Sequence, residues 1–269
     1  MILDELKSAT QRRVAREKEE MPLEEIKSRL LDSSLRRSFG FEKAISGQGM
    51  HYICEIKKAS PSKGIIAGDF PYKEIAAEYE KAGASCISCL TEPDYFKGRL
   101  SYLKEIRDIV SIPILRKDFT CDEYMIYQAA LNGADAVLLI AAILTDGELV
   151  RFMGCAESLG ISCLFEAHDE AEVKRCLNAG AKIVGVNNRD LKDFTVDISN
   201  SIRLRSFVPE NVLFVAESGI KTADDVAALK KNGVNACLIG ETLMKAADKE
   251  AVLHELEGTQ LIKKTGKKE

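Results

Sequence analysis

A repeated junction between a helix end and a strand start most constrains the fold of this chain. Gly83, Gly133, Gly180 and Gly233 lie roughly 50 residues apart, and each is followed, three positions on, by a short apolar run. Glycine is favoured just past the end of a helix because it adopts positive φ without a steric penalty. The repeat therefore predicts helices that alternate regularly with buried strands.

Eight apolar segments are predicted as strands: 51–56, 86–90, 112–115, 136–140, 161–165, 183–186, 212–216 and 236–239. Uninterrupted apolar strands that alternate with helices are typical of a parallel sheet buried on both faces. Eight such units in about 200 residues predict an α/β protein with a closed (β/α)8 barrel, also called a TIM barrel. An open, doubly wound sheet is the alternative that the repeat leaves open.

Four capping patterns agree with this layout. Thr120, Thr145, Asp169 and Thr222 each lie a few residues after a predicted strand and have an acidic residue three positions on. In such a pair the first side chain and the acid each accept a hydrogen bond from an otherwise unpaired backbone N–H. Each pattern is therefore predicted to start a helix.

Residues 1–45 are predicted as an N-terminal helical extension that packs on the barrel, within a single domain of residues 1–269. The extension is charge-rich and carries an incomplete apolar stripe. Pro22 predicts a break between two helices, because proline suits a first helical turn but not a helix interior. The basic stretch 263–268 is predicted as a frayed end rather than a binding arm.

Charge and hydropathy argue against a protein that binds nucleic acid, spans a membrane or is secreted. The net charge is −4, from 38 basic and 42 acidic residues, so the overall charge does not indicate a nucleic-acid partner. The longest apolar run, 136–144, is too short to span a bilayer. The N-terminus lacks the apolar region of a secretory signal. We therefore expect a cytoplasmic protein that binds neither nucleic acid nor membrane.

The eight cysteines do not form a metal-binding pattern. Cys86 and Cys89 have C-x-x-C spacing, but the sequence offers neither a second such pair nor a nearby histidine among its three. Most of the cysteines lie among apolar neighbours, as small buried hydrophobic residues do. We expect reduced thiols and no metal.

Polar residues gather where the predicted strands end. In a (β/α)8 barrel the chemistry lies at the carboxyl ends of the strands. The residues at these ends are Glu55 and Lys57, Arg116 to Phe119, Glu166 with His168, Asn187 to Asp190, Glu217 to Gly219, and Gly240 with Glu241. A single charge of this kind is typical of a solvated strand end, but six ends out of eight predict one shared polar site.

The last two strand ends indicate the class of ligand. Ser218 and Gly219 follow the seventh strand, and Gly240 follows the eighth. Loops at these two positions commonly bind phosphate through backbone N–H groups. Ser60 or Ser62 can reach the same pocket, and Arg189 can bind an anion through two N–H groups. The sequence therefore predicts a phosphorylated small molecule as ligand, with ordinary βα turns as the alternative.

The loop that follows Glu55 and Lys57 has the sequence Ser60-Pro61-Ser62-Lys63-Gly64. Proline lacks the backbone donor of a strand, and serine and glycine favour turns. We predict that this loop is mobile and orders over bound substrate as a partial lid.

The joint occurrence of seven motifs is similar to the indole-3-glycerol-phosphate synthase family. The motifs are Glu55-x-Lys57-x-x-Ser60-Pro61-Ser62, Leu90-Thr91-Glu92-Pro93-x-Tyr95-Phe96, Leu115-Arg116-Lys117-Asp118-Phe119, Phe165-Glu166-Ala167, Asn187-Asn188-Arg189-Asp190-Leu191, Ala216-Glu217-Ser218-Gly219-Ile220 and Leu238-Ile239-Gly240-Glu241. They cover about 52 to 245 in the order of the family. Phe96-Lys97-Gly98 departs from it, since many members have a smaller residue before the glycine.

The resemblance implies a carboxy-lyase of tryptophan biosynthesis that needs no cofactor or metal. Its substrate would be 1-(2-carboxyphenylamino)-1-deoxyribulose 5-phosphate, closed to indole-3-glycerol phosphate with loss of CO2 and water. By this resemblance Lys117 is the general acid and Glu166 its acid/base partner. Glu55 and Lys57 flank the reacting centre, with Lys57 near the anthranilate carboxylate.

The same resemblance assigns the remaining site residues. Glu217 would stabilise the cationic intermediate, and Asn187 would position hydroxyl and ring groups. The implied substrate- and phosphate-binding residues are Ser60, Phe96, Phe119, Arg189, Ser218, Gly219, Leu238, Gly240 and Glu241. The sequence identifies no protein partner among other tryptophan-pathway enzymes.

Three alternatives remain open from the sequence. Lys57 or Lys117 would form a Schiff base if the chain were an aldolase-type barrel. Phosphoribosylanthranilate isomerase is a neighbour in the same pathway, but its pattern lacks this concentration of Glu and Lys. A non-catalytic protein that binds sugar phosphates is the alternative from another class.

Overall fold

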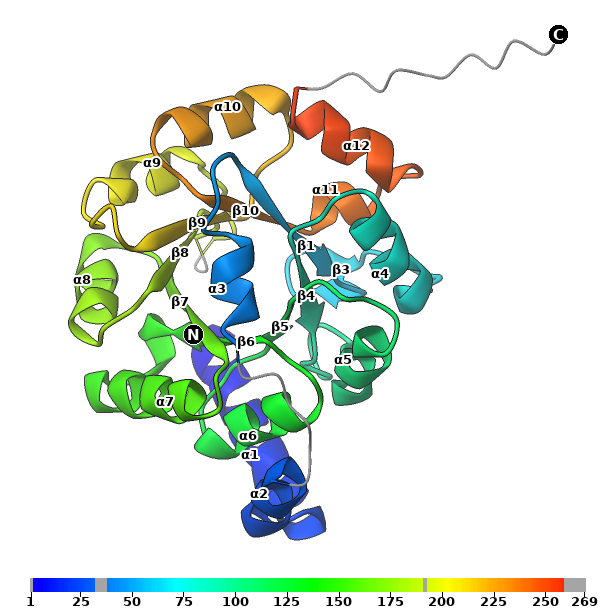
Figure 1. The fold of residues 1–269 in the computed structure, drawn as a ribbon, viewed down its shortest axis with the longest axis vertical. Helices are drawn as coiled ribbons and strands as arrows, with labels where there is room; N and C mark the ends of the chain where they lie inside the picture. Colours follow the sequence, from blue (N-terminus) through cyan, green and yellow to red (C-terminus); the bar gives the residue numbers. More distant parts are fainter. Residues whose placement is uncertain (1, 32–37, 191–192, 259–269) are drawn as a thin grey trace, which may run out of the picture.

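The computed structural model describes residues 2–31, 38–190 and 193–258, and these form a closed barrel ringed by helices (Figure 1). The eight barrel strands are β1 (His51–Ile56), β4 (Cys86–Leu90), β5 (Ile114–Lys117), β6 (Ala136–Ile140), β7 (Ser162–Ala167), β8 (Ile183–Asn187), β9 (Leu213–Glu217) and β10 (Ala236–Ile239). Each pairs in parallel with its neighbours, and β1 closes the ring by pairing with both β4 and β10. The (β/α)8 barrel is thus confirmed and the open sheet is excluded.

Helices follow the strands around the outside of the ring. They are α4 (Tyr72–Lys81), α5 (Leu100–Arg107), α6 (Glu123–Leu131), α7 (Asp146–Ser158), α8 (Glu170–Asn178), α9 (Ser199–Arg205), α10 (Ala223–Lys231), α11 (Glu241–Met244) and α12 (Lys249–Leu256), with a 3-10 turn η1 (Ala141–Ile143) before α7. The four glycines of the repeat have φ between 78° and 93°, the left-handed conformation expected after a helix.

Three of the four predicted helix starts are observed. Thr145 and Thr222 form complete capping boxes, and the Asp169 side chain accepts the backbone N–H of Glu172. The prediction for Thr120 was wrong, since α6 is capped by Asp122, whose carboxylate accepts the N–H of Tyr124. The strand before α6 runs two residues further than predicted, and this moves the helix start along the chain.

The N-terminal region contains α1 (Ile2–Glu20), α2 (Leu23–Leu31) and α3 (Gly40–Ala44), and Pro22 lies in the break between the first two. Both α1 and α2 pack against α6, and α1 also contacts η1. In Figure 1, α3 crosses the centre of the ring while α1 lies behind α6. The residues 263–268, predicted as a frayed end, lie outside the described part of the chain.

Four strands end one or two residues later than predicted from their apolar runs. β5, β7, β8 and β9 extend to Lys117, Ala167, Asn187 and Glu217, so several charged residues lie inside the strands rather than after them. Backbone pairing continues past the last apolar residue because the neighbouring strand supplies partners at the same level. The register pairs Asn187 with Glu217 and Glu217 with Leu238. These side chains are therefore rigidly placed by the sheet.

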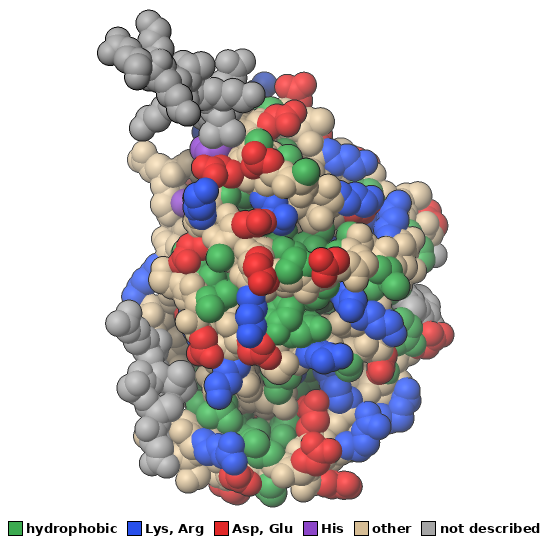
Figure 2. Space-filling model, turned by 90° about the vertical axis from the view of Figure 1, so that its right-hand side faces the viewer, with side chains coloured by type: hydrophobic (Ala, Val, Ile, Leu, Met, Phe, Trp, Pro, Cys, Tyr) green, Lys and Arg blue, Asp and Glu red, His purple; other side chains and the backbone are tan. Residues whose placement is uncertain are grey.

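The outer surface carries mixed charge. On the face shown in Figure 2, acidic and basic side chains are interspersed rather than separated by sign. Among the described residues, no helix is both long enough and apolar enough to cross a membrane.

Candidate active site

A pocket of about 650 Å³ opens at the carboxyl ends of the barrel strands. It brings together the fifteen residues that the sequence predicted for catalysis and for binding of substrate and phosphate. These are Glu55, Lys57, Ser60, Phe96, Lys117, Phe119, Glu166, Asn187, Arg189, Glu217, Ser218, Gly219, Leu238, Gly240 and Glu241. They lie on or after seven of the eight barrel strands, all but β6, so only the closed barrel makes them neighbours.

Lys117 lies at the centre of the pocket floor. Its Nζ is 2.9 Å from Oε2 of Glu166 and 2.5 Å from Oε2 of Glu217. Burial alone lowers the pKa of an ammonium group, but here the charges of Glu166 and Glu217 outweigh it and raise the pKa of Lys117. Lys117 is thus held protonated, as a proton donor must be.

The two carboxylates that share Lys117 differ in acidity. Burial raises the pKa of both, and Lys117 lowers the pKa of both. For Glu166 the cations prevail and its pKa lies well below the ordinary value. For Glu217 burial, with repulsion from Glu166, prevails and raises its pKa to about 7. Two groups of one chemical type are thereby separated into a firmly ionised carboxylate and one that titrates near neutrality.

Asn187 fixes the second oxygen of Glu166. Its Nδ2 donates to Oε1 of Glu166 at 3.2 Å, while its Oδ1 accepts the backbone N–H of Arg189 at 3.1 Å. The amide is therefore oriented from both ends. Glu217 has no such support: within the described ranges its Oε1 is buried without a hydrogen-bond partner. That oxygen is an unpaired acceptor packed against Gly185.

Glu55 and Lys57 form a second ion pair on the floor, with Nζ and Oε1 separated by 2.5 Å. Gly240 makes room for this pair, since a Cβ there would lie 2.4 Å from Oε1 of Glu55 and 3.1 Å from Nζ of Lys57. Gly185 plays the same part for Glu217, whose Oε1 would lie 2.3 Å from an added Cβ. Sequence reasoning missed Gly185, although a glycine inside a strand often marks a close approach.

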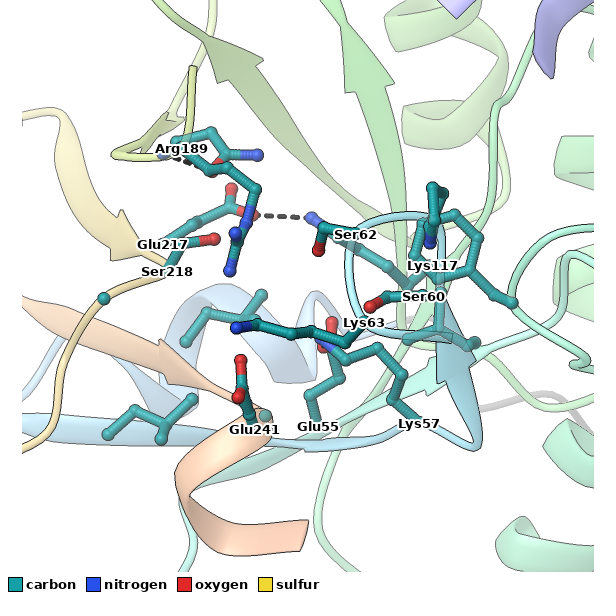
Figure 3. A pocket seen from close by; sticks show the side chains of 18 of the residues that line it. Glu55, Lys57, Ser60, Ser62, Lys63, Lys117, Arg189, Glu217, Ser218 and Glu241 are labelled. Atoms are coloured by element: carbon teal, nitrogen blue, oxygen red, sulfur yellow. Dashed lines mark hydrogen bonds and ion pairs between the residues drawn. The ribbon is translucent and has the colours of Figure 1, made fainter. Parts of the chain in front are cut away.

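The pocket rim carries the opposite charge to the floor. The floor holds three carboxylates (Glu55, Glu166 and Glu217) and two ammonium groups (Lys57 and Lys117), whereas the rim holds Lys63, Arg189, Lys221 and Lys245 against Glu241. In Figure 3, Arg189 points down toward Glu241 from above and Lys63 reaches it from the right. A salt bridge with Lys245 and the charges of Lys63 and Arg189 lower the pKa of Glu241 despite partial burial. The rim therefore suits an anion and the floor a developing cation.

The β1 loop forms a short hairpin at the rim. β2 (Ala59–Ser60) pairs antiparallel with β3 (Gly64–Ile65), although its Ser-Pro-Ser-Lys-Gly sequence was predicted not to continue a strand. Only two residues pair on each side, and Pro61 lies in the turn between them. Ser60 is buried at the pocket wall, while Ile65 is 69% exposed.

An apolar wall faces the charged floor. The rings of Phe96 and Phe119 lie 6.0 Å apart, and Glu92 holds the loop of Phe96 by accepting three backbone N–H groups. Leu3 and Leu6 of α1 line the same pocket. Their contribution was not predicted, because the local sequence of α1 does not indicate which end of the barrel the helix packs against.

Arg116 and Asp118 were expected at the shared polar site, and their charged groups point elsewhere. Arg116 donates to the carbonyl of Met125 on α6, and the Asp118 carboxylate is held by two bonds from Arg13 of α1. Arg116 and Lys117 are neighbours on β5 and therefore face opposite sides of the strand, whereas Asp118, the residue after β5, is turned toward Arg13 of α1. Lys117 therefore faces the pocket, whereas the charged groups of 116 and 118 face the helices.

The described residues contain no group of three or more His, Cys, Asp or Glu side chains placed to hold a metal ion. Cys86 and Cys89 are both buried in β4, three positions apart. Burial raises the pKa of the Cys89 thiol to about 12, so it is not a ready nucleophile.

Fold and site together define a (β/α)8 barrel whose pocket has carboxylates and ammonium groups on its floor and a mostly cationic rim. A model of the family described as indole-3-glycerol phosphate synthase matches residues 3–256. The Ruminiclostridium cellulolyticum protein named indole-3-glycerol phosphate synthase is 54% identical over 259 residues, which cover 96% of this chain and 100% of that protein. The synthase of the same name from Lacticaseibacillus paracasei is 52% identical over 94% of this chain and 97% of its own. The chain belongs to the indole-3-glycerol phosphate synthase family of lyases, as its motifs predicted.

Solved structures agree on the fold. The 3-hexulose-6-phosphate synthase of Salmonella typhimurium has a TM-score of 0.64 at 14% identity, covering 78% of this chain and 97% of its own. Thiamine phosphate pyrophosphorylase from Pyrococcus furiosus has a TM-score of 0.60 at 16% identity, covering 81% and 96%. At these identities the likeness concerns the barrel alone.

Proposed function

We propose that this chain converts 1-(2-carboxyphenylamino)-1-deoxyribulose 5-phosphate to indole-3-glycerol phosphate in the cytoplasm, within tryptophan biosynthesis. The observation that carries the proposal is Lys117 held between two carboxylates of unequal acidity on the pocket floor. The reaction loses CO2 and water with no net oxidation, so the proposal requires no redox cofactor.

Binding uses the rim and the apolar wall. The substrate carries a phosphate and a carboxylate, and the rim offers Lys63, Arg189, Lys221 and Lys245. Ser60 and the backbone of Ser218, Gly219 and Gly240 support the phosphate. Phe96, Phe119 and Leu238 take the aromatic ring, since aromatic surfaces pack favourably on one another.

Ring closure begins with proton donation from Lys117 to the ketone oxygen as the ring carbon attacks. This attack spreads positive charge over the ring and nitrogen. Glu217 and Glu55 stabilise that charge more in the transition state than in the ground state. Lys57, paired with Glu55, binds the carboxylate that leaves as CO2.

Dehydration follows with Glu166 as acid/base partner of Lys117. Its contact with Nζ of Lys117 allows a proton to pass between the two groups without water. Asn187 holds the carboxylate and positions the substrate hydroxyl groups. Lys57 assists the loss of water.

The Schiff-base alternative is disfavoured by the state of Lys117. A lysine that forms an imine must lose its proton, and such residues have lowered pKa values. The pKa of Lys117 is raised instead.

The direct test is a fluorescence assay for indole-3-glycerol phosphate with the purified chain and the carboxyphenylamino sugar phosphate. We expect steady product formation after dialysis against a chelator. Folded protein that forms no product would refute the proposal. A covalent adduct trapped by borohydride during turnover would instead support the aldolase-type alternative.

A further inference from the structure

His168 lies one residue beyond β7 and is clamped by α8. Its Nδ1 is 3.1 Å from Oε2 of Glu172, and its backbone N–H donates to the same oxygen at 2.8 Å. A carboxylate oxygen only accepts hydrogen bonds, so Nδ1 carries a hydrogen. The ring is therefore fixed in orientation and its tautomer is determined.

The other ring nitrogen faces Glu166. Nε2 of His168 lies 3.5 Å from Oε1 of Glu166, and it is buried with no hydrogen-bond partner among the described residues. With a hydrogen already on Nδ1, a neutral ring would point a lone pair at a carboxylate. A doubly protonated ring points an N–H at it instead, which is the favourable arrangement.

The surroundings of the ring favour its charged form. Glu166 faces it from β7, Glu172 from α8, and Glu217 acts from β9. The cation Lys117 is bonded to Oε2 of Glu166, whereas His168 faces Oε1. Burial lowers the pKa of His168, but the bond to Glu172 and the charges of these carboxylates outweigh it, so the net pKa is raised.

We propose that His168, clamped by Glu172, is a positioning residue that holds Glu166 ionised and in place. The inference rests on the proposed acid/base role of Glu166. Asn187 donates a hydrogen bond to Oε1 of Glu166 and Lys117 donates one to Oε2, while Nε2 of His168 faces Oε1 at ion-pair distance, 3.5 Å. When Lys117 turns to the substrate, the Oε1 anchor keeps Glu166 where it can receive a proton.

The charged state of the ring is tested directly by NMR of histidine-labelled protein. The chain has only three histidines, and His168→Gln identifies the signal of interest by its loss. We expect His168 to titrate above its ordinary value of about 6.5. Glu172→Gln and Glu166→Gln should each lower this pKa by about one unit or more, because each removes a facing charge.

Glu170→Gln is the matched control. Glu170 lies on the same helix and pairs with Lys174, so its removal should leave the His168 titration unchanged. The proposal is overturned if His168 titrates at its ordinary value in the wild-type protein. It is equally overturned if neither Glu172→Gln nor Glu166→Gln shifts the signal.

Kinetic measurements distinguish a role of His168 in positioning Glu166 from a role in packing alone. His168→Gln should lower kcat about tenfold with little change in KM. The acid limb of the pH profile should move to higher pH, because Glu166 and Glu217 both lose a neighbouring positive charge. Glu172→Gln should move it in the same direction. An unshifted profile in both folded variants would contradict the proposal. The NMR titration needs no turnover, so it remains decisive even if the proposed reaction is not observed.

Discussion

Two clusters of buried charge meet on one strand, and they differ in purpose. The inner cluster joins Lys117 of β5 to Glu166 and Glu217. The outer cluster joins Asp118, the next residue, to Arg13 and Arg116. Both are almost fully enclosed by protein, but only the charged groups of the inner cluster meet at the pocket floor.

The carboxylates Asp118 and Glu217, one from each cluster, differ in how completely they are hydrogen-bonded. The Asp118 carboxylate accepts bonds from Arg13, Arg116, Thr91 and the backbone of Phe119, and its pKa is lowered despite burial. Glu217 has one cation and an unpartnered oxygen, and its pKa is raised. Buried charge alone therefore does not identify catalysis. The feature that marks the inner cluster as a candidate site is a lysine shared by two carboxylates of unequal acidity beside the pocket.

Among the changes that test the difference between the two clusters, replacing the carboxylate of Asp118 by an amide should have the largest effect, and it should fall on stability. Asp118→Asn removes the carboxylate that Arg13 and Arg116 share and leaves, among the described residues, only Glu17, 3.7 Å from Nε of Arg13, as a counter-ion. We expect a loss of about 3 kcal/mol or more in the free energy of unfolding, measured by urea denaturation.

Asp122→Asn is the control for this change. Asp122 also pairs with α1, through Lys18 at 2.6 Å, but both side chains are about one-third exposed or more. Asparagine also remains a good helix cap. We expect a loss below about 1 kcal/mol. Equal losses of unfolding free energy in the two variants would show that the outer cluster does not stabilise the fold more than an exposed ion pair does.

Lys117→Ala should have the next largest effect, and it should fall on activity. We expect turnover to drop by roughly two orders of magnitude or more, since the proton donor is removed. Substrate affinity should change much less, because the rim still binds the anions. Steady-state and binding measurements on the folded variant check this, and near wild-type turnover would place the acid elsewhere.

The pH dependence gives the smallest effect and tests Glu217. Its pKa is raised to about 7, and it must be ionised to stabilise a cation. Values of kcat/KM should therefore fall about tenfold per pH unit below 7. Glu217→Gln should be slow at every pH and lack this limb, while keeping its stability. A variant that retains the limb would assign it to another group.

Much of the site was readable from the sequence, because barrel chemistry follows from local features. Glycines and apolar runs mark each helix end and strand, and the residues just beyond the runs are those that meet at the mouth. All fifteen predicted site residues line one pocket for this reason. The prediction that the β1 loop acts as a lid is untouched by these observations and stays a prediction.

The sequence by itself determined the alternation of strands and helices and the set of polar residues at the strand ends. Only the tertiary structure decided that Lys117 faces inward while the charged groups of Arg116 and Asp118 face the helices. It also decided that Leu3 and Leu6 reach the pocket, and that His168 faces Glu166. These outcomes depend on strand register and on contacts between distant segments, which no local pattern encodes.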